Sequence, residues 1–511
     1  MTIRDDRSTL GTWLPVGLLA TVRLLLHFVC NARGGYGYFR DELYYLASTS
    51  HLDWGYVDHP PLSIWILSVI RPLFGDSIFA LRLLPAIAGA MTVVVVALLA
   101  RELGGGRWAM ALAAAASLIA PIQLAFGTIY SMNAFDVLIW ATTGLLLAKL
   151  INGPSPRLWL VLGLCLGVGL MNKASILWLG AGLFVAIVAS PLRRELRTRW
   201  PWLAAAIALL LFSPFILWNL QNDMAHAEFI ANAVGGKYSG LGIVDLLAGQ
   251  ILLNHPANLP IWLGGLGFLL FGAGKRHRAV GITIVSVIAI LIINGSSKPE
   301  YLAGAMAMAL AAGGVALERW LRHRAWMRPA ALTLLVLGLV TTPLAIPILP
   351  VEGYVRFAQT LGLQPHTAEN KELAELPQFY ADMFGWPEKA EAVAAAYRSL
   401  PAHEQESVAI FGGNYGRAGA IDFFGPELGL PSAISPHNSY WLWGPGETDY
   451  EVILFLGGER ERLEEYFGDV QAVGRADCTY CMPYEDNLTI WAARRPRTGF
   501  DEVWDQIKSY G

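Results

Sequence analysis

One loop near the N-terminus gathers side chains that could do chemistry beside a membrane. Residues 36–62, YGYFRDELYYLASTSHLDWGYVDHPPL, contain two adjacent carboxylates, Asp41 and Glu42, a second pair of acids, Asp53 and Asp58, and a histidine, His59. The loop follows directly on an apolar segment, where ionisable groups are costly unless they have a function. A carboxylate at such a boundary can take the proton from an acceptor hydroxyl while its oxygen attacks an electrophile held at the lipid surface.

The adjacent acids Asp41 and Glu42 have two interpretations. Residues 41–50 are expected to form a short helix, and residues 60–74, opened by proline, an amphipathic segment. Both are shorter than a membrane span, so we expect them to lie along the membrane surface. Asp41 and Glu42 would then stand in the first turn of a helix, where the helix dipole favours carboxylates. They are either a helix cap or catalytic acids.

A second polar cluster, FGTIYSMNAFDVLIW, occupies residues 126–140. Asn133 and Asp136 lie three residues apart and therefore share one face of a helix. Either Asn133 caps this helix and Asp136 interacts with its first amide groups, or both side chains reach the same pocket as Asp41. The spacing alone allows both interpretations.

A third cluster, NGSSKPEYL at residues 294–302, brings Lys298 and Tyr301 to the end of a predicted span. The Lys298 ammonium could simply snorkel toward the membrane surface. It could also hold a phosphate, a task for which a compact point charge is suited. Weaker candidates for the same task are Arg40, Lys173 and Lys237.

The chain that must position these clusters has the composition of a membrane protein. Hydrophobic residues make up 55% and charged residues 15% of the sequence, and the mean hydropathy is +0.45, whereas soluble proteins carry about 25% charged residues. Apolar stretches of about 20 residues predict about eleven transmembrane helices. Their positions are 13–31, 78–100, 108–127, 134–151, 157–171, 175–191, 201–218, 258–273, 279–294, 301–317 and 330–349.

The first predicted span, 13–31, lacks a small-residue cleavage site after a short apolar core. We therefore expect it to be a retained helix and not a removed signal peptide. Arg23 and His27 fall inside it. They either face a packed or hydrated bundle interior or line the site, because ionisable groups in a span avoid lipid.

Lys and Arg in the short loops predict the orientation in the membrane. They concentrate in alternate loops, for example at 193–199 and 319–328, whereas the other loops after the first carry only Lys173, Lys237 and Lys298. The positive-inside rule puts the first set in the cytoplasm of the cell. With a cytoplasmic N-terminus and an odd number of spans, the acidic loop and the C-terminal region are both expected outside.

The composition changes near residue 350. From there apolar runs shorten and extended segments alternate with helical ones, which is typical of a small α/β domain. We therefore expect a membrane domain over 1–350, with an outer loop at 32–76 that carries the acids, and an extracytoplasmic α/β domain over 351–511. Its extended segments are 406–413, 451–458, 469–474 and 488–494, and its helical segments are near 415–424 and 461–468.

Charge and cysteine content limit the partners. A net charge of −3 and a pI near 6.4 give no reason to expect a nucleic-acid partner. Cys478 and Cys481, in CTYC, could form a disulfide, remain free thiols or belong to a metal site, although no second CxxC accompanies them. The acids of the first loop could bind a divalent cation, but a base needs none, so we expect no obligatory metal or other cofactor.

Several of these segments resemble the membrane glycosyltransferases of the GT-C class. The resemblance is to the branch that contains protein O-mannosyltransferases, the aminoarabinose transferase of lipid A and bacterial family 39 glycosyltransferases. The segments that carry it are RDELYYLA (40–47), GYVDHPPL (55–62), SMNAFDVLIW (131–140), LMNKAS (170–175), SPFILWNLQN (213–222), KPEYL (298–302), NYGRAGAIDFFG (414–425) and HNSYWLWGPG (437–446).

The resemblance implies a polytopic α-helical membrane protein of GT-C type with a C-terminal α/β extracytoplasmic domain. It implies an inverting hexosyl- or pentosyltransferase that uses a polyprenyl-phosphate sugar at the outer face of the plasma membrane. A lipid, glycan or protein would be the acceptor, and membrane lipids would surround the chain. Some branches have more spans, and the acceptors of the most similar bacterial branch are largely unassigned, so neither mannose nor a protein acceptor is carried over.

The resemblance also implies roles for particular residues. Asp41 would be the general base, Glu42 would support it, and Asp136 would match a second acid that the branches place differently. Lys298 would stand on the phosphate side of the pocket. The remaining candidates for substrate contact are Arg40, Tyr45, Asp58, His59, Asn133 and Tyr301.

Two other classes of function compete with a transferase. A lipid or glycolipid flippase also needs many spans and buried charge, but it predicts broken helices in paired halves and polar groups at the membrane midplane. The ionisable residues here gather at loop ends instead, which favours chemistry at the surface. A catalytically silent homologue would keep the fold, and the intact Asp41 and Glu42 pair argues against it.

Overall fold

The computed structural model describes residues 6–33, 35–237, 242–295, 297–365, 367, 369, 371–446 and 450–511. The chain divides into two compact units. The membrane unit comprises Met1–Gly34, Phe74–Leu217 and Gly240–Pro350, and the loop unit comprises Gly35–Leu73, Trp218–Ser239 and Val351–Gly511. The composition change near residue 350 therefore coincides with a boundary between units, and most of the acidic loop groups with the C-terminal residues.

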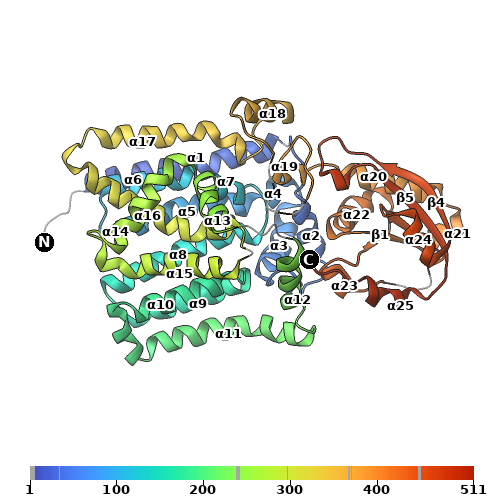
Figure 1. Ribbon diagram of the computed structural model, residues 1–511, viewed down its shortest axis with the longest axis horizontal. Coiled ribbons are helices and arrows are strands. Elements are labelled where there is room, and N and C mark those ends of the chain that lie inside the picture. The colour runs from blue at the N-terminus through green and yellow to red at the C-terminus, as the bar shows by residue number, and fades with distance from the viewer. Residues whose placement is uncertain are drawn as a thin grey trace. The chain divides into compact units, whose positions relative to one another are not determined.

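The membrane unit is built of helices (Figure 1). They are α1 (Asp6–Arg33), α4 (Ile78–Leu81), α5 (Leu83–Glu102), α6 (Arg107–Ile119), α7 (Pro121–Phe126), α8 (Met132–Asn152), α9 (Pro156–Asn172), α10 (Ile176–Val188), α11 (Trp200–Gln221), α13 (Ile243–Leu253), α14 (Leu259–Leu270), α15 (Arg278–Asn294), α16 (Ala303–Trp320) and α17 (Met327–Leu337). The last turn of α11, from Trp218 onward, belongs to the loop unit.

Each of the eleven apolar stretches in the sequence contains a helix, but not all of these helices are long enough to cross a membrane. Within the described residues, 7 helices meet the length and hydropathy expected of a span, or 8 if α10 and the bent 3-10 turn after it count as one. The stretches at 108–127, 157–171 and 258–273 contain shorter helices. In the first of them Pro121 ends α6 and starts α7, because proline cannot donate the backbone hydrogen bond that a continuous helix needs.

Helix α16 lies at the centre of the membrane unit and packs against α5, α6, α8, α14 and α15 (Figure 1). Its sequence, AGAMAMALAAGGVALERW, is rich in small residues, which let helix backbones approach closely in a membrane protein. At Gly313 an added Cβ would lie only 2.3 Å from the backbone oxygen of Ile261 in α14. The small side chains of α16 therefore set how closely the surrounding helices pack.

Arg23 and His27 of α1 face the packed interior of the membrane unit. Both side chains are fully buried. The Arg23 guanidinium donates to the backbone oxygens of Ser117 and Gln123, and the His27 ring nitrogens lie 2.8 Å from the Arg23 oxygen and 3.0 Å from the Leu124 oxygen. These contacts join α1 to the break between α6 and α7, which matches the bundle-interior interpretation.

The loop unit combines short helices with one sheet. The helices are α2 (Arg40–Ser48), α3 (Leu62–Phe74), α12 (Ala225–Asn232), α18 (Val351–Thr360), α19 (Gln378–Ala381), α20 (Trp386–Ser399), α21 (Ala402–Glu406), α22 (Tyr415–Leu428), α23 (Ser439–Trp443), α24 (Arg460–Tyr466) and α25 (Phe500–Trp504). The strands are β1 (Val408–Gly412), β2 (Ala433–Ile434), β3 (Val452–Leu456), β4 (Phe467–Ala476) and β5 (Leu488–Pro496).

The sheet has the order β2-β1-β3-β5-β4. Strands β2, β1 and β3 are parallel, with Ile410 opposite Leu454, and β5 pairs antiparallel with both β3 and β4. Helix α22 connects the parallel strands β1 and β2, as a crossover must. The extended and helical segments predicted after residue 406 are all present, and the predicted class, a helical membrane protein with a C-terminal α/β domain, is confirmed.

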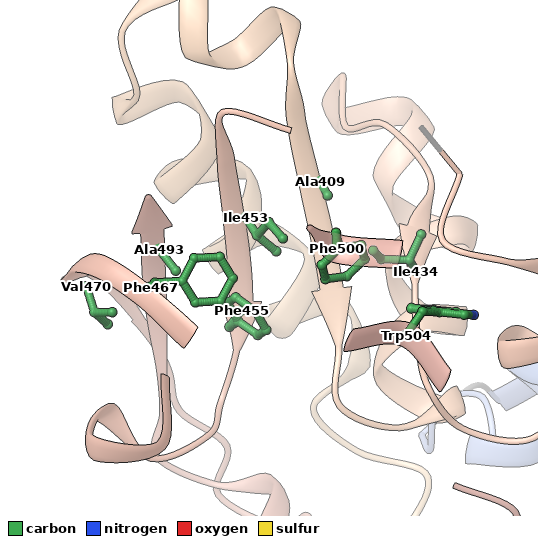
Figure 2. Close-up of a cluster of buried hydrophobic side chains, with 9 residues drawn as sticks. All are labelled: Ala409, Ile434, Ile453, Phe455, Phe467, Val470, Ala493, Phe500 and Trp504. Carbon is green, nitrogen blue, oxygen red and sulfur yellow. The ribbon is translucent and has the colours of Figure 1, made fainter. Parts of the chain in front are cut away.

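The two faces of the sheet are covered differently. Alternate side chains of the strands, such as Ile453 and Phe455, join Phe500 and Trp504 of α25 in one apolar cluster (Figure 2). The other face carries α20 and α22, which pack on the strands. These two longer helices fix one side of the domain, and α22 also supports the acidic loop.

Candidate active site

Helix α2 carries the acidic pair, and Glu42 forms its N-terminal cap. The Glu42 side chain is fully buried, and its Oε2 accepts a hydrogen bond from the Phe39 backbone N–H at 2.8 Å. A carboxylate in this position satisfies one of the amide groups that a helix start leaves unpaired. Glu42 therefore orients the first turn of α2, in which Asp41 stands beside it.

Two glycines of α22 let α2 pack against it at close range. An added Cβ at Gly419 would lie 2.9 Å from the Leu43 backbone carbon, and one at Gly416 would lie 2.5 Å from the Arg40 Cγ. Any larger side chain at either position would push the helices apart. The sequence GRAG at the start of α22 thus determines where Asp41 is held.

The Asp41 carboxylate is partly open to solvent. Its side chain is 37% exposed. The Tyr415 hydroxyl, from the first turn of α22, donates to Asp41 Oδ1 at 2.8 Å, and the Arg40 Nε lies 3.5 Å from the same oxygen. Both contacts are made to one oxygen, so they orient the carboxylate while leaving it accessible.

Arg40 is held by the C-terminal part of the loop unit. Its backbone N–H donates to the Asp382 oxygen at 2.9 Å, its NH1 donates to the Tyr484 hydroxyl at 2.8 Å, and its NH2 lies 3.7 Å from Asp382 Oδ2. The guanidinium also lies over the Tyr415 ring, 5.3 Å from its centroid. With only 13% of its side chain exposed, Arg40 orients the groups around Asp41.

Burial shifts the pKa values of two groups around Arg40. Burial raises the pKa of Asp382 to about 7, with Arg40 opposing the shift and Asp41 adding to it, and its Oδ1 has no hydrogen-bond partner among the described residues. Burial likewise raises the pKa of Tyr415 well above its usual value. Tyr415 therefore remains a hydroxyl donor to Asp41 at neutral pH, whereas Asp382 changes charge near neutrality.

The Asp58 and His59 pair is packed among aromatic rings. The Tyr44 hydroxyl donates to Asp58 Oδ1 at 2.9 Å and is hydrogen bonded to Ser439 Oγ at 2.7 Å. The buried His59 ring packs against Tyr45 in a tilted arrangement, with 4.6 Å between centroids, and its Nε2 lies 3.9 Å from Asp58 Oδ1. These contacts bring together the Tyr45, Asp58 and His59 of the sequence prediction, on the same loop as Asp41.

The segment after α11 also holds the acidic loop. The Trp218 indole N–H donates to Asp53 Oδ2 at 2.7 Å, and a ring nitrogen of His226 lies 2.9 Å from the Val57 oxygen. Burial lowers the pKa of His226, with the Val57 and Asp58 contacts opposing the shift. Trp218 lies in SPFILWNLQN (213–222), one of the segments that carry the family resemblance, whereas His226 lies outside all of them.

Four residues that contact Arg40, Asp41 or Tyr44 were not predicted. They are Asp382, Tyr415, Ser439 and Tyr484. Tyr415 and Ser439 fall in NYGRAGAIDFFG and HNSYWLWGPG, whose resemblance to a known family could have identified them. Asp382 and Tyr484 carry no local signal, because only the fold brings them to α2.

The second predicted cluster forms in the membrane unit. The Lys173 ammonium donates to Asn133 Oδ1 at 2.6 Å and lies 3.9 Å from Asp136 Oδ2. It also stands over the Tyr301 ring, 5.6 Å from its centroid. Among the lysine and arginine candidates, Lys173 therefore contacts Asn133, Asp136 and Tyr301 together.

Asp136 accepts several hydrogen bonds inside this cluster. Its Oδ1 accepts from the Trp140 indole N–H at 3.2 Å and from Ser175 Oγ at 3.2 Å. Ser131, and not Asn133, caps α8, since its hydroxyl accepts from the Asn133 backbone N–H at 3.3 Å. Asp136 is therefore a buried acid with a lysine and two hydroxyl or indole donors around it.

Lys298 begins the 3-10 turn Pro299–Leu302, which leads into α16. Its backbone oxygen accepts a hydrogen bond from the Tyr301 N–H at 3.1 Å. It thus directly precedes the turn that carries Tyr301. The side chain of Lys237 lies outside the described residues.

A further cavity lies apart from the acidic loop. It has a volume of about 530 Å³ and is formed by the α25 face of the sheet and the turns after β1 and β3. None of its described lining residues belongs to α2 or to residues 51–62. In the described part of the chain, no three His, Cys, Asp or Glu side chains gather in an arrangement suited to a metal ion.

Comparisons with known proteins agree with this architecture. The family described as dolichyl-phosphate-mannose-protein mannosyltransferase matches residues 58–218. A lipid A galacturonosyltransferase, RgtD, of Rhizobium johnstonii is 24% identical over 317 residues, which is 60% of this chain and 64% of that protein. An undecaprenyl phosphate-alpha-4-amino-4-deoxy-L-arabinose arabinosyl transferase of Pseudomonas fluorescens is 26% identical over 178 residues, 32% of this chain and 30% of that protein.

The chain thus spans less than two thirds of the length of these sequence relatives. The structural likeness extends further. The crystal structure of ArnT from Cupriavidus metallidurans bound to undecaprenyl phosphate superposes with a TM-score of 0.61 at 14% identity, over 93% of this chain and 97% of that chain. The resemblance predicted from the sequence segments is confirmed: the chain is similar in sequence to membrane glycosyltransferases and similar in fold to ArnT.

Proposed function

We propose that the chain is a glycosyltransferase that moves a sugar from a polyprenyl-phosphate donor to an acceptor hydroxyl at the outer face of the plasma membrane. The relatives named above support the donor class, because one of them is named for an undecaprenyl phosphate sugar and the solved relative is bound to undecaprenyl phosphate. The sugar, whether a hexose or a pentose, and the acceptor, whether lipid, glycan or protein, are left open in this proposal.

The observation that carries the proposal is the setting of Asp41. Its carboxylate is oriented by Tyr415 and Arg40 through one oxygen, while 37% of the side chain is exposed. A general base needs both a fixed direction and access for the hydroxyl that it deprotonates. The other acids of the loop are engaged differently, since Glu42 caps α2 and Asp58 accepts from Tyr44.

In the proposed reaction Asp41 takes the proton from the acceptor hydroxyl as the acceptor oxygen bonds to the anomeric carbon. The bond from that carbon to the phosphate oxygen breaks, and the polyprenyl phosphate leaves with the electron pair. A single displacement of this kind inverts the anomeric configuration. One positioned base contributes about 10²–10⁴-fold to the rate, and neutralising the leaving phosphate stabilises the charge that develops there.

We assign the remaining site residues to positioning and to substrate contact. Glu42 and Arg40 hold α2 and the Asp41 carboxylate, and Asp58 and His59 shape the rest of the loop. In the membrane unit, Lys173 joins Lys298 as a candidate for the lipid phosphate, because its ammonium lies in the cluster of Asn133, Asp136 and Tyr301. We propose no obligatory metal ion.

The orientation is part of the same proposal. The positive-inside rule puts the N-terminus in the cytoplasm and the C-terminal domain outside. The acidic loop would then lie on the outer side of the membrane, where the proposed reaction uses the lipid-linked sugar. Labelling of single introduced cysteines in intact cells, for example at exposed positions 460 and 324, would test this arrangement.

The activity itself can be tested with the full chain in lipid nanodiscs. We would supply a panel of radiolabelled polyprenyl-phosphate sugars, with and without an extract of the host envelope, and measure release of the lipid phosphate. Release that requires the extract, with label transferred to an extract component, is the expected result. Release that is equal without any acceptor would identify a hydrolase instead.

A parallel measurement addresses the competing transporter. A fluorescent lipid-linked sugar is placed in the outer leaflet of vesicles that contain the chain, and its movement to the inner leaflet is followed. The proposal expects no movement above that of empty vesicles. Movement without any release of lipid phosphate would contradict the transferase and favour the flippase.

A further inference from the structure

The loop that connects β4 and β5 contains a pair of cysteines that the proposed reaction does not use. This loop, at residues 477–487, carries the sequence DCTYCMPYEDN. Cys478 and Cys481 are free thiols, and the Cys481 thiol donates to the Cys478 oxygen at 3.6 Å. This contact places the Cys481 sulfur beside the Cys478 backbone, so the two thiols belong to one short turn of the loop.

The two thiols differ in access. Cys478 is half-buried, whereas only 4% of Cys481 is exposed. A molecule that approaches from solvent therefore meets Cys478 first. The inner thiol stands behind it, in the position needed to displace whatever becomes attached to Cys478.

A buried lysine faces the outer thiol. A Cβ built on Gly385 would lie 2.6 Å from the Cys478 Sγ and 2.8 Å from the Lys389 Nζ, so the sulfur and the ammonium share one small space. The Lys389 side chain is only 1% exposed, and its ammonium lies 3.8 Å from Glu485. Glu485 also pairs with Arg417 at 2.9 Å, so one carboxylate faces two cations.

Cys478 lies between a cation and a carboxylate, since its thiol is near Lys389 and its backbone N–H donates to Asp486 Oδ1 at 2.7 Å. The pKa of Cys478 is lowered to about 7 by the Cys481 hydrogen bond, with burial opposing the shift and Lys389 supporting it. The pKa of Cys481 is raised by the same hydrogen bond and by burial. Nucleophilic cysteines are partly exposed and lie near a cation, as Cys478 does near Lys389, whereas buried structural cysteines are inert.

We propose that Cys478 and Cys481 form a thiol–disulfide exchange site, in which Cys478 is the nucleophile and Cys481 the resolving thiol, and that disulfide compounds are its substrates. The Cys478 thiolate attacks one sulfur of the compound, forms a mixed disulfide and releases the other half as a thiolate. Cys481 then loses its proton and attacks the Cys478 sulfur, which releases the second thiolate. The chain is oxidised by two electrons, and one disulfide compound is reduced to two thiols.

This site is connected to Arg40 through two routes. The same loop carries Tyr484, whose hydroxyl accepts from Arg40 NH1 at 2.8 Å. Gly385, which lies beside Cys478, comes three residues after Asp382, whose backbone oxygen accepts from the Arg40 backbone N–H. Forming the disulfide removes the thiolate from Lys389 and draws Cys481 toward Cys478, so we expect Arg40 to be held differently in the two states.

The exchange step is tested with the full chain in nanodiscs and oxidised glutathione. After blocking with iodoacetamide, mass spectrometry of the peptide around 477–487 should show the loss of two hydrogens in the native chain. Cys481→Ser should trap a glutathione adduct on Cys478, and Cys478→Ser should react at least about tenfold more slowly at Cys481. Equal adduct formation on both cysteines, or none on Cys478 in folded chain, would overturn the proposal.

The role of Lys389 is tested by its own pair of variants. Lys389→Met should slow adduct formation on Cys478 about three- to tenfold, since the thiolate loses a neighbouring cation, whereas Lys389→Arg should retain most of the rate. Cys165→Ser in the membrane unit serves as a control and should change nothing. An unchanged rate in Lys389→Met, with folding verified by the melting temperature, would remove Lys389 from the site.

The connection to Arg40 is measured by hydrogen exchange in the dithiol and disulfide forms. We expect amides at 39–42 and 382–386 to differ at least about threefold between the forms, and this difference should vanish in the Cys478→Ser, Cys481→Ser double variant. Identical exchange in both forms would show that the site is not connected to Arg40. Neither this readout nor the adduct requires sugar transfer, so failure of the proposed function would not be mistaken for failure here.

Discussion

Asp41 and Asp136 look alike in the sequence but stand in opposite surroundings. Each is an acid near the start of a helix that follows aromatic residues. The Asp41 side chain is 37% exposed, and its two contacts use one oxygen. The Asp136 side chain is 10% exposed, and its carboxylate meets Lys173, Trp140 and Ser175.

The difference separates an acid that is available for chemistry from one whose bonding capacity is already used. A carboxylate that accepts hydrogen bonds from an indole and a hydroxyl and faces an ammonium has little left for a substrate hydroxyl, and it contributes mainly to the structure of α8. The contacts of Asp41 with Tyr415 and Arg40 involve only its Oδ1. Changes around Asp136 should therefore appear first as lost stability, and changes around Asp41 as lost turnover.

The largest expected effect on stability comes from Lys173→Met. This change leaves Asp136 buried without its cation, which costs about 3–5 kcal/mol for a buried pair. The matched control is Lys149→Met, because the Lys149 side chain is 39% exposed where it meets Glu102 at 2.9 Å, and an exposed pair contributes about 0–1 kcal/mol. Unfolding of the nanodisc-embedded chain, followed by thiol accessibility of Cys165, measures both.

If Lys173→Met and Lys149→Met lose the same stability, the structural role assigned to Asp136 in the membrane unit is wrong. Turnover of the folded Lys173→Met chain adds a second result. A loss of turnover without a loss of stability would assign Lys173 to substrate binding.

Asp382→Asn tests the electrostatic surroundings of Asp41. The pKa of Asp382 in the folded chain is raised to about 7 from 3.8 by burial, so the folded state holds a proton that the unfolded state releases. The stabilisation is fully present below pH 4 and is lost as the pH rises toward 7. The native chain should therefore lose about 2–4 kcal/mol between pH 4 and pH 8 relative to Asp382→Asn.

Denaturant unfolding of the two chains at a series of pH values measures this difference. Because Asn cannot ionise, the free energy of unfolding of Asp382→Asn varies with pH through every other group but not through residue 382. A difference that is flat with pH, or that grows in favour of the native chain as the pH rises, would contradict the assignment.

Gly419→Val tests whether α22 sets the position of Asp41. The new side chain would meet the Leu43 backbone at less than contact distance, and such overpacking costs about 1–3 kcal/mol. Turnover should fall by more than the folded fraction does, since α2 must move away from Tyr415. Glu427→Val, at an exposed position of the same helix, should leave both quantities nearly unchanged.

Tyr415→Phe has the smallest expected effect. It removes one hydrogen bond to Asp41 Oδ1 while keeping the ring under Arg40, so turnover should fall about three- to tenfold, or about 0.5–1.5 kcal/mol. The control is Tyr397→Phe, whose hydroxyl bonds the Gln405 oxygen within the C-terminal region. Equal rates in native and Tyr415→Phe chains would mean that the carboxylate needs no such orientation.

The sequence predicted local features well because they depend on local patterns. The helix expected over 41–50 is present as Arg40–Ser48, and the alternation after residue 406 corresponds to the observed strands and helices. Asn133 and Asp136 do lie on one face, since Lys173 meets both. Spans were overcounted where apolar stretches contain breaks, as at Pro121.

Contacts between distant segments could not be predicted. Arg40 looked like a phosphate ligand beside a membrane, but Tyr484 and Asp382, more than 340 residues away, surround it. Lys173 looked weaker than Lys298 because nothing in LMNKAS indicates that Tyr301 stands over it. Periodicity and spacing describe one element at a time, and pairing between elements depends on the assembled fold.

Release of polyprenyl phosphate by Asp41 variants tests whether Asp41 is the general base. Native chain, Asp41→Asn, Asp41→Glu and, as a control from the same loop, Asp53→Asn would be compared in nanodiscs with one donor and its acceptor. We expect Asp41→Asn to lose about 10²–10⁴-fold in turnover, Asp41→Glu to retain part of it, and Asp53→Asn to stay within about threefold of native. Full turnover by folded Asp41→Asn would contradict the account, because Asp41 would then not be the base.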